Sequence, residues 1–301
     1  MTQDQQAPEP TLISADDFQI VSGLLKRMTG IHIGGNKRAM VSGRLAKRLR
    51  ALGIASVPAY CDLLQQPGNN AEVDAFISAL TTNMTRFNRE DHHFAHLNDR
   101  VLPALAATAR TGRRVRLWSA ACSTGEEAYD LAFRVLEACP EAARLDVRIL
   151  ATDIDKSALE IARAGAYPAT SLSNLPDGFA ERYMDAGTAA PGMVSVRSAP
   201  RDLVTFRCLN LNADWPFKGP FDVIMCRNVT IYFDAETQAR LWRRLADRIC
   251  PGGALYAGHS EMLPDNVAAR FAQEDRGAFR LGRETPAPAP TAPTEQTRTE
   301  A

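Results

Sequence analysis

The spacing of apolar residues over the first ninety positions predicts a small helical domain. Apolar residues recur every three or four positions, as they do on the buried face of a helix. The first helix is expected to begin after Ser14, which can form a capping box with Asp17, and to end at Gly30. Further helices are predicted at about 36–51, 58–65 and 71–80. We therefore expect an all-helical domain over residues 12–88, followed by a helical linker over 89–112.

From residue 113 onward, short apolar runs alternate with amphipathic stretches. This alternation is typical of βαβ units and a mostly parallel sheet, which predicts a doubly wound α/β domain over residues 113–283. Strands are expected at 115–118, 147–151, 204–208, 223–226, 254–257 and 278–281, and helices at 126–138, 157–164 and 235–249. The alternation breaks between residues 165 and 203, where the period-two run 193–197 indicates a small antiparallel β insertion. We place this insertion at about 180–208.

Composition narrows the class of protein. With 301 residues and 45% apolar residues the chain can bury a large core, and its zero net charge argues against a globally basic nucleic-acid binder. The first and last segments, 1–11 and 284–301, are polar or rich in Pro, Ala and Thr and are expected to be disordered. No stretch approaches the roughly 20 apolar residues of a membrane span. Six scattered cysteines without a C-x-x-C pair indicate a reduced, cytoplasmic protein.

Charge is unevenly distributed along the helical domain. Residues 18–61 contain no Asp or Glu but carry eight cations, among them Arg44, Lys47, Arg48 and Arg50. Such a segment in a neutral protein is typical of a surface that binds an anionic partner. The plainer alternative is a solvated helix face, and residue types alone leave both interpretations open.

Polar residues that follow the predicted strands mark a candidate site. The run 223–226 stops at Arg227 and Asn228, and Tyr232 comes four residues later. The second strand ends in Asp153 and Asp155, of which Asp153 is expected to hold ribose hydroxyls and Asp155 to cap the next helix. Ligands of open α/β sheets bind beyond the carboxyl ends of the strands, so we expect these side chains to share a site.

The loop after the first predicted strand, 119–125, consists entirely of small residues. Small residues allow a bound nucleotide to approach the backbone at the N-terminus of the next helix. Glu127 in that helix argues against a pyrophosphate and favours a cationic ligand group, although a capping box between Thr124 and Glu127 is the plainer explanation. A G-x-G-x-x-G fingerprint is absent, which argues against a dinucleotide dehydrogenase.

The histidines do not predict a metal site. His92 and His96 are one helical turn apart, but the glutamate of an H-E-x-x-H motif is missing and no third ligand is suggested by spacing. We therefore interpret them as ordinary histidines of a helical linker and expect no metal. His259 also follows a predicted strand, and we expect it to pack or to form hydrogen bonds and not to act in catalysis.

Several motifs occur together in an order that resembles the CheR family, the chemoreceptor glutamate O-methyltransferases of bacterial chemotaxis. The motifs lie at 81–90, 119–127, 153–155, 226–233 and 258–261, and the resemblance extends over about residues 14–283. It implies a helical domain joined to a Rossmann-like S-adenosylmethionine domain with a small β subdomain. It also implies methyl transfer from S-adenosylmethionine to receptor glutamates, with S-adenosylhomocysteine as the product.

The resemblance assigns roles by motif position. It implies that Glu127 faces the methionyl ammonium, that Asp153 holds the ribose, and that Arg89 and Tyr232 lie nearest the reacting methyl group. The remaining residues implied to line the cofactor cleft are Asn83, Thr85, Asn210, Leu211, Arg227 and Asn228. The basic second helix, with Arg44, Lys47, Arg48 and Arg50, matches the surface thought to dock on the acidic methylation region of receptors.

The chain departs from the family pattern at three positions. The family usually reads Ala-Phe-Phe-Arg where this chain has residues 86–89, so Arg86 adds a charge and Asn88 replaces an aromatic residue. Thr230 stands where Met is common. Two alternative functions remain: a regulator that binds S-adenosylmethionine without catalysis, and a nucleic-acid methyltransferase that uses the basic domain. We expect a monomer that binds neither nucleic acid nor membrane interior.

Overall fold

Four helices form the first domain in a computed structural model of the chain, which describes residues 12–187, 190–217 and 219–282. The predicted start and end of the first helix are confirmed, because Ser14 Oγ accepts the N–H of Asp17 and Gly30 adopts the left-handed conformation. The inward faces of the helices form one core around Leu25, Leu45 and Phe76. The helices are α1 (Ala15–Thr29), α2 (Arg38–Leu52), α3 (Val57–Gln65) and α4 (Asn70–Leu80). The terminal segments that were expected to be disordered, 1–11 and 284–301, lie outside the described residues.

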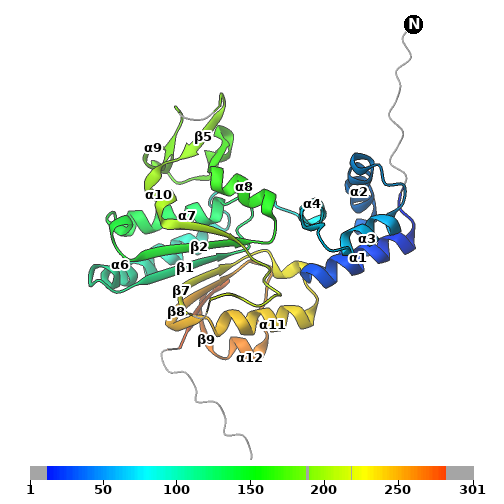
Figure 1. Cartoon of the computed structure of the whole chain (residues 1–301). Helices are drawn as coiled ribbons and strands as arrows, with labels where there is room; N and C mark the ends of the chain where they lie inside the picture. Colours follow the sequence, from blue (N-terminus) through cyan, green and yellow to red (C-terminus); the bar gives the residue numbers. More distant parts are fainter. Residues whose placement is uncertain (1–11, 188–189, 218, 283–301) are drawn as a thin grey trace, which may run out of the picture.

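A seven-stranded sheet forms the centre of the second domain (Figure 1). Its order is β6-β2-β1-β7-β8-β10-β9, in which the first five strands are parallel and the last two antiparallel. The strands are β1 (Val115–Ala120), β2 (Val147–Asp153), β6 (Val204–Cys208), β7 (Phe221–Cys226), β8 (Ile249–Ala257), β9 (Phe271–Asp275) and β10 (Ala278–Leu281). The six predicted strands are confirmed, and β9 was missed because this exposed edge strand has no apolar run.

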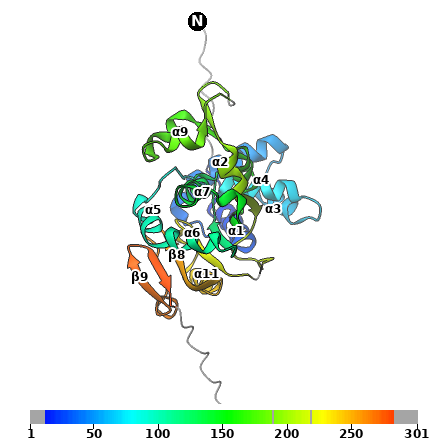
Figure 2. The ribbon, with the colours of Figure 1, turned by 90° about the vertical axis from the view of Figure 1, so that its left-hand side faces the viewer.

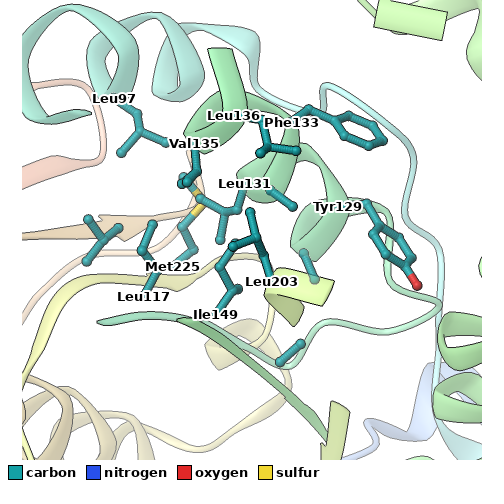
Figure 3. Close-up of a cluster of buried hydrophobic side chains, with 14 of the residues drawn as sticks. Leu97, Leu117, Tyr129, Leu131, Phe133, Val135, Leu136, Ile149, Leu203 and Met225 are labelled. Carbon is teal, nitrogen blue, oxygen red and sulfur yellow. The ribbon is translucent and has the colours of Figure 1, made fainter. Parts of the chain in front are cut away.

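Side chains alternate between the two faces of the sheet and build two cores. Leu117 of β1 joins the core with α7, part of which is drawn in Figure 3, whereas Trp118 joins the core with α11. Both faces of the parallel strands are therefore buried, as the predicted doubly wound class requires. The helices of this domain are α5 (Asp91–His96), α6 (Leu102–Arg110), α7 (Glu126–Ala138), α8 (Lys156–Ala164), α9 (Phe179–Tyr183), α10 (Ser198–Leu203), α11 (Ala235–Ala246) and α12 (Asp265–Ala268).

Two predicted boundaries need correction. The small antiparallel sheet has the order β3-β5-β4, with β3 (Ala166–Pro168), β5 (Met193–Val196) and β4 (Met184–Asp185), and it projects beyond the main sheet together with α9 (Figure 2). The insertion therefore begins earlier than the predicted 180–208, and residues 204–208 are β6, which pairs with β2 in the main sheet. Strands as short as β3 and β4 have too few residues to show a period of two.

The segment 89–112, expected to be a linker, belongs to the α/β domain. Phe94 of α5, Leu97 and Val101 of the π-helical turn Leu97–Val101, and Leu102 of α6 pack in the same core as β1 and α7. In the described part of the chain, no helix combines the length and apolar character needed to cross a membrane.

Candidate active site

A cleft of about 1120 Å³, part of it open to solvent, lies between the helical domain and the carboxyl ends of the parallel strands. The end of α1, the residues after α4 and the loops that follow β1, β2, β6 and β7 all contribute to its walls. Ten side chains were predicted to bind the cofactor or act in catalysis, and all ten line this one cleft; their individual roles stay predictions. They are Asn83, Thr85, Arg89, Glu127, Asp153, Asn210, Leu211, Arg227, Asn228 and Tyr232.

A buried ion pair between Glu127 and Arg227 joins α7 to the end of β7. Glu127 Oε2 accepts Arg227 Nε at 2.7 Å, and Glu127 Oε1 accepts the hydroxyl of Ser119 at 2.7 Å. The guanidinium of Arg227 also donates to the carbonyl of Arg89 at 2.7 Å. The alternative of a capping box between Thr124 and Glu127 is wrong: α7 is capped by Gly125, and the Thr124 hydroxyl bonds Glu126. Glu127 thus reaches the cleft in a fixed orientation.

His93 and Glu90 complete this buried network. Burial, together with the neighbouring charge of Arg227, lowers the pKa of His93 to about 4, so the ring is neutral and Nδ1 accepts from Arg227 at 3.1 Å. Burial would raise the pKa of Glu90, but hydrogen bonds from His259 and the charge of Arg227 hold it at about 2. His259 therefore has the hydrogen-bonding role that was expected from the sequence, because its Nδ1 lies 2.6 Å from Glu90 Oε1. No three His, Cys, Asp or Glu side chains of the described segments form a possible metal site.

Glu261 holds the loop after β7 and was not singled out by sequence reasoning. Its buried carboxylate accepts the backbone N–H groups of Asn228, Val229, Thr230 and Gly258 and the hydroxyl of Thr230, all at 2.7–2.9 Å. These bonds support Asn228 in a left-handed conformation with φ +60°. A side chain at Gly258 would meet Asn228 within 2.8 Å, so only glycine fits there. In the sequence, the sign of the importance of Glu261 was that residues 258–261 directly follow a predicted strand.

Of the two aspartates at the end of β2, Asp155 caps the next helix as predicted, whereas the ribose contact of Asp153 stays a prediction. Asp155 Oδ1 accepts the N–H of Ser157 at 2.9 Å and caps α8. Its other oxygen accepts the Thr81 hydroxyl at 2.9 Å and the Asn83 amide at 2.6 Å, which ties the end of the helical domain to the sheet. Asp153 lines the cleft and accepts the N–H of Ser123 at 2.8 Å. Burial raises the pKa of Asp153 to about 6, although backbone hydrogen bonds oppose the shift.

The helical domain also contacts the loop that carries Tyr232. The carbonyl of Tyr232 accepts the N–H of His32 at 2.7 Å, and Lys37 Nζ lies 5.7 Å from the centre of the Tyr232 ring. Asn210 donates to the carbonyl of Met28 at 2.9 Å. Asn210 is therefore a residue that joins the domains as well as one that lines the cleft.

Comparison with known proteins supports the two-domain architecture. The model of the CheR methyltransferase all-alpha domain matches residues 16–81, and that of the CheR methyltransferase SAM-binding domain matches residues 83–277. The chain belongs to the CheR methyltransferase family. The boundary between the two matches falls where Asp155 holds Thr81 and Asn83.

The sequence is similar to those of chemotaxis protein methyltransferases over most of their length. The chain is 46% identical to the probable chemotaxis protein methyltransferase of Rhizobium etli over 235 residues, which cover 78% of this chain and 88% of the relative. It is 39% identical to the chemotaxis protein methyltransferase of Escherichia coli over 281 residues, 93% of this chain and 95% of the relative. As a CheR methyltransferase the chain is an S-adenosylmethionine-dependent enzyme, which decides against the non-catalytic alternative.

The cleft fits the cofactor of a CheR methyltransferase. Three small residues of the loop 119–125, Ala121, Cys122 and Ser123, line the cleft, and Ala121 and Ser123 have positive φ. The carboxylates of Asp153 and Glu127 line the cleft, and carboxylates can accept hydrogen bonds from ribose hydroxyls and from an ammonium group. Apolar side chains of the wall suit an adenine ring; they are Ile154, Leu209, Leu211, Val229 and Phe233.

The predicted receptor-docking set needs correction at two positions. Arg44 donates to the carbonyls of Ala79 and Thr81 at the end of α4. Arg48 pairs with Glu72, which raises the Arg48 pKa further above its usual value. Both cations face α4 because α2 and α4 pack together, whereas Lys47 and Arg50 are exposed.

Proposed function

We propose that this CheR methyltransferase transfers the methyl group of S-adenosylmethionine to glutamate side chains of chemoreceptors, forming methyl esters and S-adenosylhomocysteine. The observation that carries the proposal is the charge pattern of the cleft. Arg89 and Tyr232 line it and can hydrogen-bond a carboxylate, whereas its own carboxylates, Glu127 and Asp153, are already bonded to the protein. The names of the relatives support the same assignment.

A glutamate acceptor needs no general base. Its ordinary pKa is about 4.3, so at neutral pH the nucleophile is already ionised. The ring of His32, which also lines the cleft, forms no hydrogen bond with a carboxylate within the described residues, although catalytic bases are usually oriented by such a partner. Catalysis would then rest on alignment of the reactants, which can contribute roughly 7–11 kcal/mol.

The residues of the cleft have distinct proposed roles. The cofactor, when bound, supplies a methyl group made electrophilic by its sulfonium. Glu127, held by Ser119 and Arg227, would accept hydrogen bonds from the methionyl ammonium without having to reorient. Tyr232 would orient the acceptor carboxylate, and Arg89 would position both cofactor and carboxylate. A strong pairing with Arg89 would slow the reaction, because methylation removes the charge that it stabilises.

The surface of α2 suggests how an acidic receptor segment is brought to the cleft. Lys47 and Arg50 remain as the exposed cations of the predicted docking set. We propose that they attract the receptor, and that the enzyme acts as a cytoplasmic monomer. Size-exclusion chromatography with light scattering tests the monomer directly.

The function is tested by transfer of labelled methyl from S-adenosylmethionine to membranes that contain chemoreceptors. We expect label on the receptor band and its release as methanol in alkali, because carboxyl methyl esters hydrolyse there. A His32→Gln variant tests whether the cleft supplies a general base, and we expect it to retain activity because the acceptor is already ionised. Label that resists alkali, or no label despite bound cofactor, would contradict the proposal.

A further inference from the structure

The backbone around Arg89 is held in an unusual conformation. Asn88 and Glu90, on either side of Arg89, have φ values of +53° and +56°, in the left-handed region that residues other than glycine rarely adopt. Such conformations persist where surrounding bonds fix them, and they cluster at functional sites. The groups that fix these two residues therefore also fix the direction in which Arg89 enters the cleft.

Two charged residues of α7 hold Asn88. Asp130 Oδ2 accepts the backbone N–H of Asn88 at 2.6 Å, and Arg134 donates to Asn88 Oδ1 at 2.8 Å. Asp130 has 0% and Arg134 4% of its surface exposed. The guanidinium of Arg134 is also 4.4 Å from the centre of the Phe179 ring. Both bonds therefore form away from water, where they are stronger than at the surface.

The same helix holds the other side of Arg89. Glu127, one turn before Asp130, binds Arg227, which donates to the carbonyl of Arg89 at 2.7 Å. The N–H of Asn88, before Arg89, is thus bonded directly to Asp130 of α7. The carbonyl of Arg89 is bonded through Arg227 to Glu127 on the same face of α7. A single rigid helix therefore sets the position of Arg89 relative to Glu127.

A purely structural role does not account for Asp130. Both its Oδ1 and the Nε of Arg134 are buried and have no hydrogen-bond partner among the residues that the structure describes. Burial raises the pKa of Asp130 to about 7, although the bond from Asn88 opposes the shift. Unpartnered buried groups destabilise a fold, and an apolar residue of similar size would avoid that cost. Two polar side chains are explained at this buried place if they are retained for the hydrogen bonds that they form with Asn88.

We propose that Asp130 and Arg134 are positioning residues that act through Asn88 to hold Arg89 in the cleft. The inference rests on the proposed role of Arg89 and deepens it. It assigns to the first turns of α7 both the carboxylate that faces the cofactor and the group that places Arg89.

A double-mutant cycle on the full-length protein tests the proposal. The dissociation constant of S-adenosylhomocysteine is measured by calorimetry, and the kcat and KM of methyl transfer are measured beside it. Asp130→Ala is expected to weaken binding and lower kcat by about tenfold, the lower end of what a lost charged hydrogen bond costs. Asp130→Asn keeps an acceptor for the Asn88 N–H and is expected to restore most of that loss. In an Arg89→Ala background, Asp130→Ala should have no further effect.

Equal effects of Asp130→Ala in both backgrounds would overturn the proposal and leave Asp130 a structural residue. Thermal unfolding of each variant shows whether the protein is folded. If Asp130→Ala does not fold, Arg134→Met replaces it in the cycle, because Met keeps the packing on Phe179 but removes the donor. Binding of S-adenosylhomocysteine needs no methyl acceptor, so the cycle decides the inference even if receptor glutamates are not the substrate.

Discussion

At the scale of single residues, the cleft is lined by polar groups that are held by partners far away in sequence. Arg227 reaches Glu127, 100 positions earlier, and Glu261 binds a loop 31–33 positions before it. These partners fix the side chains before any ligand arrives, which is the condition for efficient electrostatic catalysis. Within the described segments the hydroxyl of Tyr232 has no such partner, and we propose that it contacts the substrate.

Replacing Tyr232 by Phe tests that division. The change removes one hydroxyl and keeps the ring, so we expect kcat to fall by about tenfold, the lower end for a hydrogen bond to a charged group. The dissociation constant of S-adenosylhomocysteine should change little, because the proposed partner of the hydroxyl is the acceptor carboxylate. Steady-state kinetics and calorimetry give the two values. Equal loss of turnover and cofactor affinity would contradict the assignment.

Asp153 predicts how cofactor affinity depends on pH. A ribose hydroxyl donates to the ionised carboxylate, so binding is strong above the Asp153 pKa of about 6 and is lost as pH falls through it. One pH unit below that value we expect S-adenosylhomocysteine to bind about tenfold more weakly. Asp130 also titrates near neutral pH, so Asp153→Asn is the control. The proposed ribose contact would be wrong if this variant kept the full pH dependence of the wild type.

Only some of the site residues could be found from the sequence. The cap formed by Asp155 was predictable because its partner, Ser157, is two residues away. The importance of Glu261 and Asp130 was not, since their partners are brought to them by the fold. Asn88 shows the same limit: its departure from the family pattern is visible in sequence, but its bonds to Asp130 and Arg134 are not.

At the scale of elements, periodicity located helices well but did not show which polar face was exposed. The spacing of α2 was predicted, yet Arg44 and Arg48 turned out to face α4. The elements that were missed, such as β3, β4 and β9, are short or lie at an exposed edge and have no periodic apolar pattern. The amphipathic helix α7 was predicted with its observed bounds because thirteen residues give a clear period.

The exposed part of α2 predicts a salt-dependent contact with the receptor. Reversing the charges at Lys47 and Arg50 to Glu is expected to raise the receptor KM several-fold at low salt and to leave S-adenosylhomocysteine binding unchanged. The difference should shrink as salt is added, because exposed charges are screened. The double change Arg113→Glu and Arg114→Glu, at the opposite end of the strands, is the matched control because it alters the net charge by the same amount. Equal effects of both changes on the receptor KM would show that receptor binding depends on the net charge of the enzyme and not on this face of α2.

At the scale of the whole molecule, the active site exists because two domains are held together. The end of α1 meets the loop after β6, where Asn212 donates to the carbonyl of Thr29 at 2.8 Å. Lys26 of α1 also pairs with Asp234, the N-cap residue of α11, at 2.8 Å. Asp155 joins the same domains on the other side of the cleft. Sequence predicted both domains and their order, but nothing local in it specifies this joint.

Gly30→Ala tests the joint. Gly30 has φ +81°, and an added Cβ would lie 2.1 Å from Asn212 Nδ2, so the change is expected to separate α1 from the sheet domain. Gly53→Ala is the matched control, because Gly53 also ends a helix at positive φ but has open space around it. The free energy of unfolding should fall by about 1 kcal/mol in both variants because of backbone strain. It should fall further in Gly30→Ala because of the close contact with Asn212. Only Gly30→Ala should weaken S-adenosylhomocysteine binding; equal binding by both variants would contradict a cleft shared between domains.

The central claim is that this cleft directs a methyl group to a glutamate carboxylate. The most direct measurement is tandem mass spectrometry of chemoreceptor peptides after incubation with the enzyme and S-adenosylmethionine, with and without alkali. The account predicts single methyl groups on glutamate side chains that disappear in alkali. Methylation of lysine, arginine or nucleic acid in the same preparation, with unmodified glutamates, would contradict it.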